Sequence, residues 1–252
     1  MSQIFSGIDV STQSQKIVVL DLENDSIIYS DSINYDEDLP QYETTNGVIR
    51  NTQPGVSESD PNMWIDGLHL LFKRLSKKTD IISSIKALSI SGQQHGLVSV
   101  DKSGNLVKPT SKLWNDFSTQ EECDILTEKV GGKKNMIAEV SNSQRTGYTA
   151  SKIFHMQRNE IDFFNKTHQF LLVHNYINCF LTGGIMIMEQ GDASGTGLWD
   201  PVKKEWSKEI TKIISNDLMS KLPPVSSSLK RLSKPTKERN ASVGNIVIFS
   251  SL

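Results

Sequence analysis

The first third of the chain carries apolar and polar residues in the pattern of short β-strands. β-Branched runs separated by polar turns occupy three consecutive segments, 4–10, 16–22 and 26–33. Because the turns between them are short, we expect an antiparallel meander. Two more apolar runs, 86–91 and 97–100, predict strands on either side of a strongly polar insert.

Helical patterns dominate the rest of the chain. Asp60-Pro61 is a typical helix start, and the apolar residues after it recur at helical spacing, which gives one stripe to pack on the sheet. These apolar residues are Trp64, Leu68, Leu71 and Leu75. Further helices are predicted at 119–129, 149–159, 170–181 and 205–217. Strands followed by helices predict a layered α/β domain whose last compact element ends near Val225.

Composition and charge narrow the class of protein. A chain of 252 residues with 37% apolar residues can bury a large core, either as one domain or as a domain with an irregular tail. The net charge of -2 gives the chain no overall positive electrostatic field that would attract nucleic acid. The N-terminus lacks the features of a signal peptide and no apolar run reaches about 18 residues, so we expect a cytoplasmic protein without a membrane partner. Cys123 and Cys179 lack metal-ligand spacing and are expected to be buried thiols.

The turn after the first predicted strand carries groups that suit phosphate binding. Asp9 ends the strand, and a lysine, Lys16, opens the next one. The turn between them contains Ser11, Thr12 and Gln13. A carboxylate can hold hydrated Mg²⁺, turn N–H groups and hydroxyls can bind phosphate oxygens, and a lysine can offset developing charge. Taken alone, the pattern also fits an ordinary hairpin with a polar turn.

Two later segments suit a polyhydroxylated ligand. In Ser-Gly-Gln-Gln-His-Gly at 91–96, two glycines bracket side chains that both donate and accept hydrogen bonds, among them Gln94 and His95. A single loop histidine is also often structural. Trp114 is followed by Asn115 and Asp116, a combination suited to packing on a sugar ring and fixing its hydroxyls. A core Trp before a helix-capping Asn-Asp fits these residues equally well.

Two further segments are less specific. In 147–159, Thr149 is the expected N-cap of a helix, with Lys152 near the entrance of the site. In 189–200, Asp192 lies among small residues that permit close backbone approach, and we favour a structural corner for it.

Together and in this order, these segments resemble the FGGY carbohydrate kinases, and within that family the xylulokinases, from about residue 4 to 228. The resemblance implies an actin-like, ribonuclease-H-like α/β fold with a mixed sheet and helices on its faces. It also implies ATP and Mg²⁺ as cofactors and phosphorylation of a ketopentose, D-xylulose to D-xylulose 5-phosphate. Asp9 would be the catalytic, Mg²⁺-linked carboxylate. The implied phosphate-binding residues are Ser11, Thr12, Gln13 and Lys16, and the implied sugar-binding residues are Gln94, His95, Trp114 and Asp116.

The sequence departs from the family pattern at three places. Ser11 replaces a common glycine, and His155 stands where the family pattern has tryptophan. After the match, the family's Gly-Asp-Asn motif and nucleotide domain are not recognised. We therefore expect 1–228 to be the N-terminal, sugar-binding domain and 229–252 an aberrant tail, with 246–249 lacking a partner strand and the C-terminal nucleotide-binding domain absent. Loss of the motif's base would cost roughly 10²–10⁴-fold in rate.

Two other classes of function stay open at this point. One is a catalytically inactive fragment that binds a sugar, or binds a partner through its basic tail. The other is a different actin-like ATPase, against which the Gln-Gln-His loop argues because such proteins share only the phosphate hairpin. Oligomeric state is not predicted by any pattern in the chain.

Overall fold

A computed structural model of the chain describes residues 3–50, 53–78, 80–226, 231–233 and 247–249. Its main sheet has the strand order β15-β16-β7-β1-β2-β3. The strands are β1 (Ile4–Val10), β2 (Ser14–Asp21), β3 (Ser26–Asn34), β7 (Ile85–Gly92), β15 (Arg231–Ser233) and β16 (Val247–Phe249). β1, β2 and β3 form the predicted antiparallel meander, and β7 pairs parallel to β1. The sheet is therefore mixed, as expected.

Two short strands from the end of the chain complete this sheet. β16 pairs parallel with β7, and β15 pairs antiparallel with β16. The expectations that no element follows Val225 and that 246–249 lacks a partner strand are therefore wrong. The physical reason is that β7 leaves one edge unpaired by β1, and a β-branched run such as Val247-Ile248 suits such an edge.

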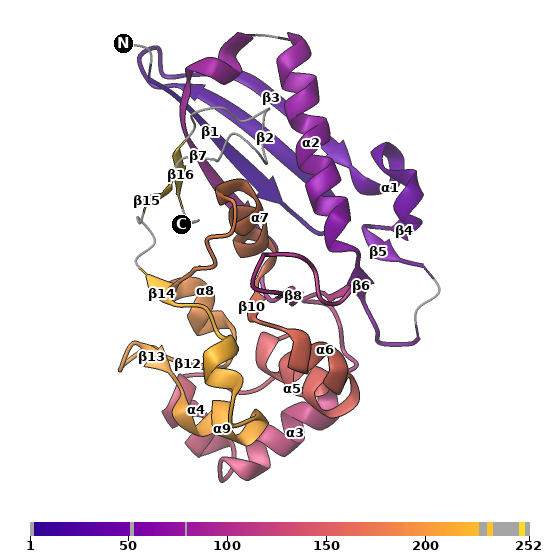
Figure 1. Cartoon of the computed structure of the whole chain (residues 1–252), viewed down its shortest axis with the longest axis vertical. Helices are drawn as coiled ribbons and strands as arrows, with labels where there is room; N and C mark the ends of the chain where they lie inside the picture. The colour runs from indigo at the N-terminus through magenta and orange to yellow at the C-terminus, as the bar shows by residue number, and fades with distance from the viewer. Residues whose placement is uncertain (1–2, 51–52, 79, 227–230, 234–246, 250–252) are drawn as a thin grey trace.

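The first apolar core lies between this sheet and two helices, α2 (Pro61–Lys78) and α7 (Val173–Thr182). Trp64, Leu68 and Leu71 on the predicted stripe of α2 are fully buried, and Figure 1 shows α2 lying across the sheet. The prediction of a helix that packs on the meander is thus confirmed.

A second core lies at the opposite end of the molecule in Figure 1 and is helical. Its helices are α3 (Gln120–Lys129), α4 (Lys133–Val140), α5 (Thr149–Asn159), α6 (Ile161–Lys166) and α9 (Lys208–Ile214). Buried side chains such as Leu126, Ile153 and Ile210 fill it. The loops that carry the candidate chemistry run between these two cores.

Two predicted helices begin instead with strands. The segment 170–181 divides into β10 (Gln169–Leu171) and α7, and 205–217 divides into β13 (Glu205–Trp206) and α9. β10 pairs with β8 (Val98–Val100), outside the main sheet. Because the run before α7 is apolar at nearly every position, its periodicity cannot separate a buried strand from a buried helix.

Short elements connect these parts. They are α1 (Tyr35–Asp38), η1 (Pro40–Tyr42), β4 (Thr44–Thr45), β5 (Val48–Ile49), β6 (Glu58–Ser59), η2 (Asp80–Ser84), β9 (Ser111–Lys112), β11 (Met188–Glu189), α8 (Gln190–Gly195), β12 (Trp199–Asp200), η3 (Leu218–Lys221) and β14 (Val225–Ser226). Within the described ranges, no helix combines the length and the apolar character needed to cross a bilayer. Cys123 and Cys179 are buried free thiols, as expected.

Candidate active site

The end of β1 and the start of β2 expose a carboxylate and a lysine side by side. Asp9 lies opposite Lys16 in the antiparallel register of β1 and β2, so both side chains point to the same face of the sheet. Both residues are exposed. The Ser11 hydroxyl donates to Asp9 Oδ2, and the Ser91 hydroxyl of β7 donates to Asp9 Oδ1 over 3.2 Å. The carboxylate is thus held by two hydroxyls while remaining open to solvent.

Thr12 connects this hairpin to the two segments predicted to face a sugar. The Trp114 indole N–H donates to Thr12 Oγ1 over 2.9 Å, and the Thr12 hydroxyl donates to Gln93 Oε1 over 3.4 Å. The Trp114 side chain is half exposed, at 50%. Gln13 is exposed, and its backbone carbonyl accepts from the N–H of Tyr35. Three segments that are distant in sequence therefore meet around one hydroxyl.

The loop after β7 is packed against residues of the helical half. His95 has a left-handed backbone conformation, with φ 62°. Its ring lies on Tyr148, with 4.6 Å between ring centroids, and a Cβ added at Gly195 of α8 would come within 3.1 Å of His95 Cε1. Gln94 is exposed and its amide donates to Asp192 Oδ1 over 3.5 Å. The histidine ring is therefore closely confined and Gln94 is within reach of a ligand.

This confinement determines the protonation state of His95. Burial, together with the nearby Lys152 charge, lowers the pKa of His95 to about 4, and the Asp192 carboxylate only partly opposes this. The imidazole is consequently neutral near pH 7, with one nitrogen that donates and one that accepts. Such a ring can hydrogen-bond a hydroxyl in either direction without carrying charge.

Asp192 is the centre of a buried polar cluster. His174 Nε2 lies 2.5 Å from Asp192 Oδ2, and the Asn175 amide donates to the same oxygen over 3.3 Å. Burial raises the pKa of Asp192, but the His174 charge and the hydrogen bonds outweigh burial, so the pKa lies below its ordinary value. The sequence favours a structural role for Asp192, and its carboxylate also accepts a hydrogen bond from the Gln94 amide. Sequence reasoning missed His174, although a His-Asn pair at the start of an otherwise apolar helix was a usable signal.

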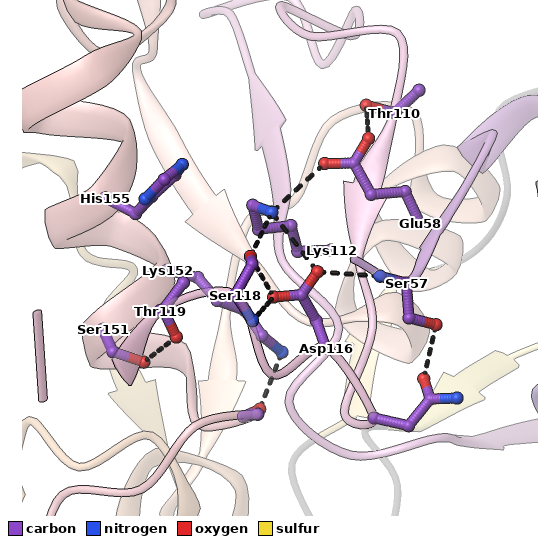
Figure 2. Close-up of polar contacts among 12 residues, drawn as sticks. Ser57, Glu58, Thr110, Lys112, Asp116, Ser118, Thr119, Ser151, Lys152 and His155 are labelled. Atoms are coloured by element: carbon purple, nitrogen blue, oxygen red, sulfur yellow. Dashed lines mark hydrogen bonds and ion pairs between the residues drawn. The ribbon is translucent and has the colours of Figure 1, made fainter. Parts of the chain in front are cut away.

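Asp116 has a different environment from the one expected of a sugar ligand. Its side chain is fully buried, at 0% exposed, and Figure 2 shows its carboxylate surrounded by partners from the chain itself. It accepts hydrogen bonds from the Ser57 N–H, from the N–H and hydroxyl of Ser118, and from Lys112 Nζ at 3.2 Å. Lys112 also lies 3.6 Å from Glu58. The carboxylate therefore serves to hold the Trp114 loop in place rather than to face solvent.

Lys152 is not at the entrance, contrary to expectation. Its side chain is 1% exposed, and its Nζ donates to the backbone carbonyls of His95, at 2.6 Å, and Gly147, at 2.7 Å. Burial lowers the pKa of Lys152 to about 7, while Asp116 acts in the opposite direction. Thr149, the expected N-cap, is instead the first residue of α5, and Tyr148 occupies the cap position. Because the helix begins after Tyr148, Lys152 turns inward beneath the loop.

Comparisons with known proteins agree with this architecture. The N-terminal domain of the FGGY family of carbohydrate kinases matches residues 4–252, beyond the position 228 reached by the sequence resemblance. The chain is 36% identical over 220 residues to the xylulose kinase of Haemophilus influenzae and 33% identical over 212 residues to that of Lactococcus lactis. These matches cover 85% and 84% of this chain but 42% and 39% of the relatives. The chain therefore spans about two fifths of the length of these curated relatives.

Solved structures support the same fold. A ligand-bound xylulose kinase from Lactobacillus acidophilus superposes with a TM-score of 0.83 at 21% identity, covering 98% of this chain and 48% of that one. A glycerol kinase from Plasmodium falciparum with ADP gives 0.84 at 23% identity, covering 99% and 48%. These likenesses confirm the predicted actin-like fold. With the family match over residues 4–252, they show that this chain belongs to the FGGY family of carbohydrate kinases.

Proposed function

We propose that this chain provides the sugar-binding domain of a kinase that transfers the γ-phosphoryl group of ATP to the terminal hydroxyl of D-xylulose. The observation that carries the proposal is the hydrogen-bonded connection from Trp114 through Thr12 to Gln93, which brings the phosphate hairpin against the sugar loop. Phosphoryl transfer requires this proximity of the two substrates. The relatives named xylulose kinase support the choice of a ketopentose.

The sugar subsite in this proposal consists of Gln94, His95 and Trp114. The neutral imidazole and the exposed amide supply donors and acceptors for hydroxyls. The half-exposed indole provides a flat apolar surface for the carbon skeleton. A site built on hydrogen bonds to hydroxyls discriminates strongly against analogues that lack them, because its polar groups are then left unpaired.

The phosphate subsite consists of the turn after β1. No three His, Cys, Asp or Glu side chains cluster as a metal site among the residues that the structure describes. Mg²⁺ in phosphoryl-transfer sites commonly binds one or two carboxylates, water and the substrate phosphates. The single carboxylate of Asp9 is therefore enough for such a site. Asp9 would hold the ion, which would neutralise phosphate charge, and Lys16 with the Ser11 and Thr12 hydroxyls would bind the phosphate oxygens. Gln13, exposed in the same turn, completes this set.

Isothermal titration of the 252-residue chain with D-xylulose, L-ribulose, L-xylulose and glycerol tests the sugar assignment. We expect the tightest binding for D-xylulose and the weakest for glycerol, which offers fewer hydroxyls. His95→Ala should weaken D-xylulose binding by about tenfold or more, since a hydroxyl partner is lost. His168→Ala is the matched control, because His168 is a half-buried histidine outside the site. Equal affinities across the panel, or equal losses in the two variants, would contradict the proposal.

ADP production with Mg²⁺-ATP and the same sugars tests the phosphoryl-transfer step. We expect turnover to require both D-xylulose and Mg²⁺ in a preparation that contains every domain of the enzyme. Turnover with an equal rate for all four sugars would contradict the assignment of D-xylulose. Phosphorylation of a protein or nucleotide in place of a sugar would contradict the proposal as a whole.

A further inference from the structure

One buried lysine contacts the backbone of the His95 loop of the proposed sugar subsite and the backbone of the loop at Gly147, which packs against Trp114. Lys152 lies in the first turns of α5, and its side chain passes beneath the loop after β7. Its Nζ donates to the carbonyl of His95 over 2.6 Å and to the carbonyl of Gly147 over 2.7 Å. Figure 2 shows the same side chain next to the Asp116 carboxylate. A single amine is thus shared by two loops that are about fifty residues apart in the sequence.

The first of these contacts stabilises an unfavourable backbone. His95 adopts φ 62°, a left-handed conformation that non-glycine residues rarely occupy without support. The Lys152 amine fixes the carbonyl of this residue from below, while Tyr148 and Gly195 confine its ring from the sides. Removal of the amine would free the carbonyl and with it the direction of the imidazole.

The second contact reaches the other side of the sugar subsite. Gly147 has φ 85°, and a Cβ built on it would lie 2.1 Å from the carbonyl oxygen of Trp114. The backbone at Gly147 is therefore packed directly against the backbone of Trp114. Because Lys152 fixes the Gly147 carbonyl, it also fixes the surface on which the Trp114 loop rests.

We propose that Lys152 is a positioning residue of the sugar site, whose buried amine holds the backbones of His95 and Trp114 in the relative placement that a ketopentose requires. The inference rests on the proposed function for the identity of the ligand. It adds a role for a residue that does not touch the sugar. Lys152 acts through the carbonyls of the two loops.

The chain offers a matched control for this proposal. Lys221 is also buried, at 8% exposed, and its Nζ donates to two backbone carbonyls, those of Asn165, at 3.4 Å, and Thr167, at 2.8 Å. These carbonyls end α6, away from the hairpin and the sugar loop. Lys221 Nζ also lies 3.5 Å from Asp217 Oδ2, so Lys221→Met removes an ion pair in addition to its carbonyl contacts. Both methionine variants take a buried amine away from backbone carbonyls, but only Lys152→Met does so at the site.

Hydrogen exchange and sugar titration of the 252-residue chain test the proposal together. In Lys152→Met we expect amides of 93–97 and 146–149 to exchange about tenfold faster, because the carbonyl anchor of both loops is lost. We also expect the Kd for D-xylulose to rise by about tenfold or more, since small misplacements of binding groups are costly. In Lys221→Met, faster exchange should be confined to 165–168, with the Kd within about twofold of the unmodified chain.

Each outcome bears on a defined claim. Unchanged exchange in 93–97 and an unchanged Kd in Lys152→Met would overturn the positioning role. Equal Kd increases in both methionine variants would also overturn it, since a general loss of stability would then explain them. If the unmodified chain does not bind D-xylulose while Lys152→Met still accelerates exchange in both loops, the proposed function fails and the anchoring by Lys152 stands.

A second variant covers the case in which Lys152→Met does not fold. Lys152→Gln keeps an amide donor on a shorter side chain, so we expect it to retain one of the two carbonyl contacts and to give smaller increases in exchange and Kd. Amine-reactive labelling of the unmodified chain gives an independent readout. Burial should make Lys152 react far more slowly than the exposed Lys16 although its lowered pKa leaves more of its amine unprotonated, and labelling at the same rate would overturn the buried anchor.

Discussion

The proposed phosphate hairpin, formed by β1, β2 and the turn at 11–13, lies next to the proposed sugar loop at 93–97, but the two are held in different ways. Asp9 and Lys16 are exposed and are placed by the register of two adjacent strands. His95 and Gln94 depend on buried partners 57 and 98 residues away, Lys152 and Asp192. The hairpin can therefore change its chemistry with little effect on stability. In the proposed sugar loop, the contacts that hold the fold also place the proposed binding groups, so substitutions there should affect both stability and binding.

The largest effect is expected at the buried cluster behind the sugar loop. Asp192→Ala leaves His174 and Asn175 without their shared acceptor, so the free energy of unfolding should fall by about 3 kcal/mol. Urea denaturation measures this loss. Asp101→Ala, which removes the carboxylate of an exposed turn, should cost about 1 kcal/mol or less. A loss of similar size in the two variants would remove the proposed contrast between buried and exposed carboxylates.

The next effect compares two glycines, one supporting each region. Gly47 has φ 74° and a Cβ there would lie 1.9 Å from the Thr12 carbonyl oxygen, while Gly147 is packed in the same way against Trp114. Alanine at either position should lower the free energy of unfolding by about 2 kcal/mol. Gly55→Ala is the control, because Gly55 has φ 82° and a Cβ there would meet its nearest atom, the Phe117 carbonyl carbon, at an ordinary 3.8 Å, so it should lose only about 1 kcal/mol. Equal losses at all three positions would show that close packing contributes nothing.

Between pH 4 and 6.5, the loop after β7 should make stability depend on pH through His95. The pKa of His95 is about 4 in the folded chain and near its usual value of about 6.5 when unfolded, so the unfolded chain binds more protons between these pH values. Stability should therefore rise with pH from 4 to 6.5 and show no further contribution from His95 above that. Urea denaturation at several pH values should give a shallower rise for His95→Gln. His168→Gln, outside the loop, should keep the full rise, and identical curves for His95→Gln and the unmodified chain would contradict the shift.

The smallest effect on stability is expected at the hairpin. Asp9→Asn should change the free energy of unfolding by less than about 0.5 kcal/mol, because the side chain is exposed. The same variant should abolish Mg²⁺-dependent turnover in the complete enzyme while Glu37→Gln, also exposed, leaves it intact. A large loss of stability in Asp9→Asn would mean that the hydroxyls of Ser11 and Ser91 use this carboxylate to hold the fold rather than to present a ligand site.

Local patterns predicted much of the architecture. The meander and α2 follow from periodicity that extends over one strand or a few helical turns, and both formed as predicted. The division of 170–181 into β10 and α7 did not follow, because a uniformly apolar run has no period. The family resemblance correctly predicted the fold. The resemblance grouped Asp116 with the sugar ligands. In the structure, the Asp116 carboxylate accepts its hydrogen bonds from Ser57, Ser118 and Lys112 of the chain itself.

The sequence by itself determined the strands of the meander, the polar turn that ends β1 and the composition of the Gln-Gln-His loop. These features depend on residues that are near one another in the chain. Only the tertiary structure decided which groups hold that loop. Lys152 donates hydrogen bonds to the backbone carbonyls of His95 and Gly147. Because every residue has a backbone carbonyl, the pattern of side chains along the sequence does not predict which carbonyls a lysine will contact. The contact exists because the two cores bring α5 beneath the loop after β7.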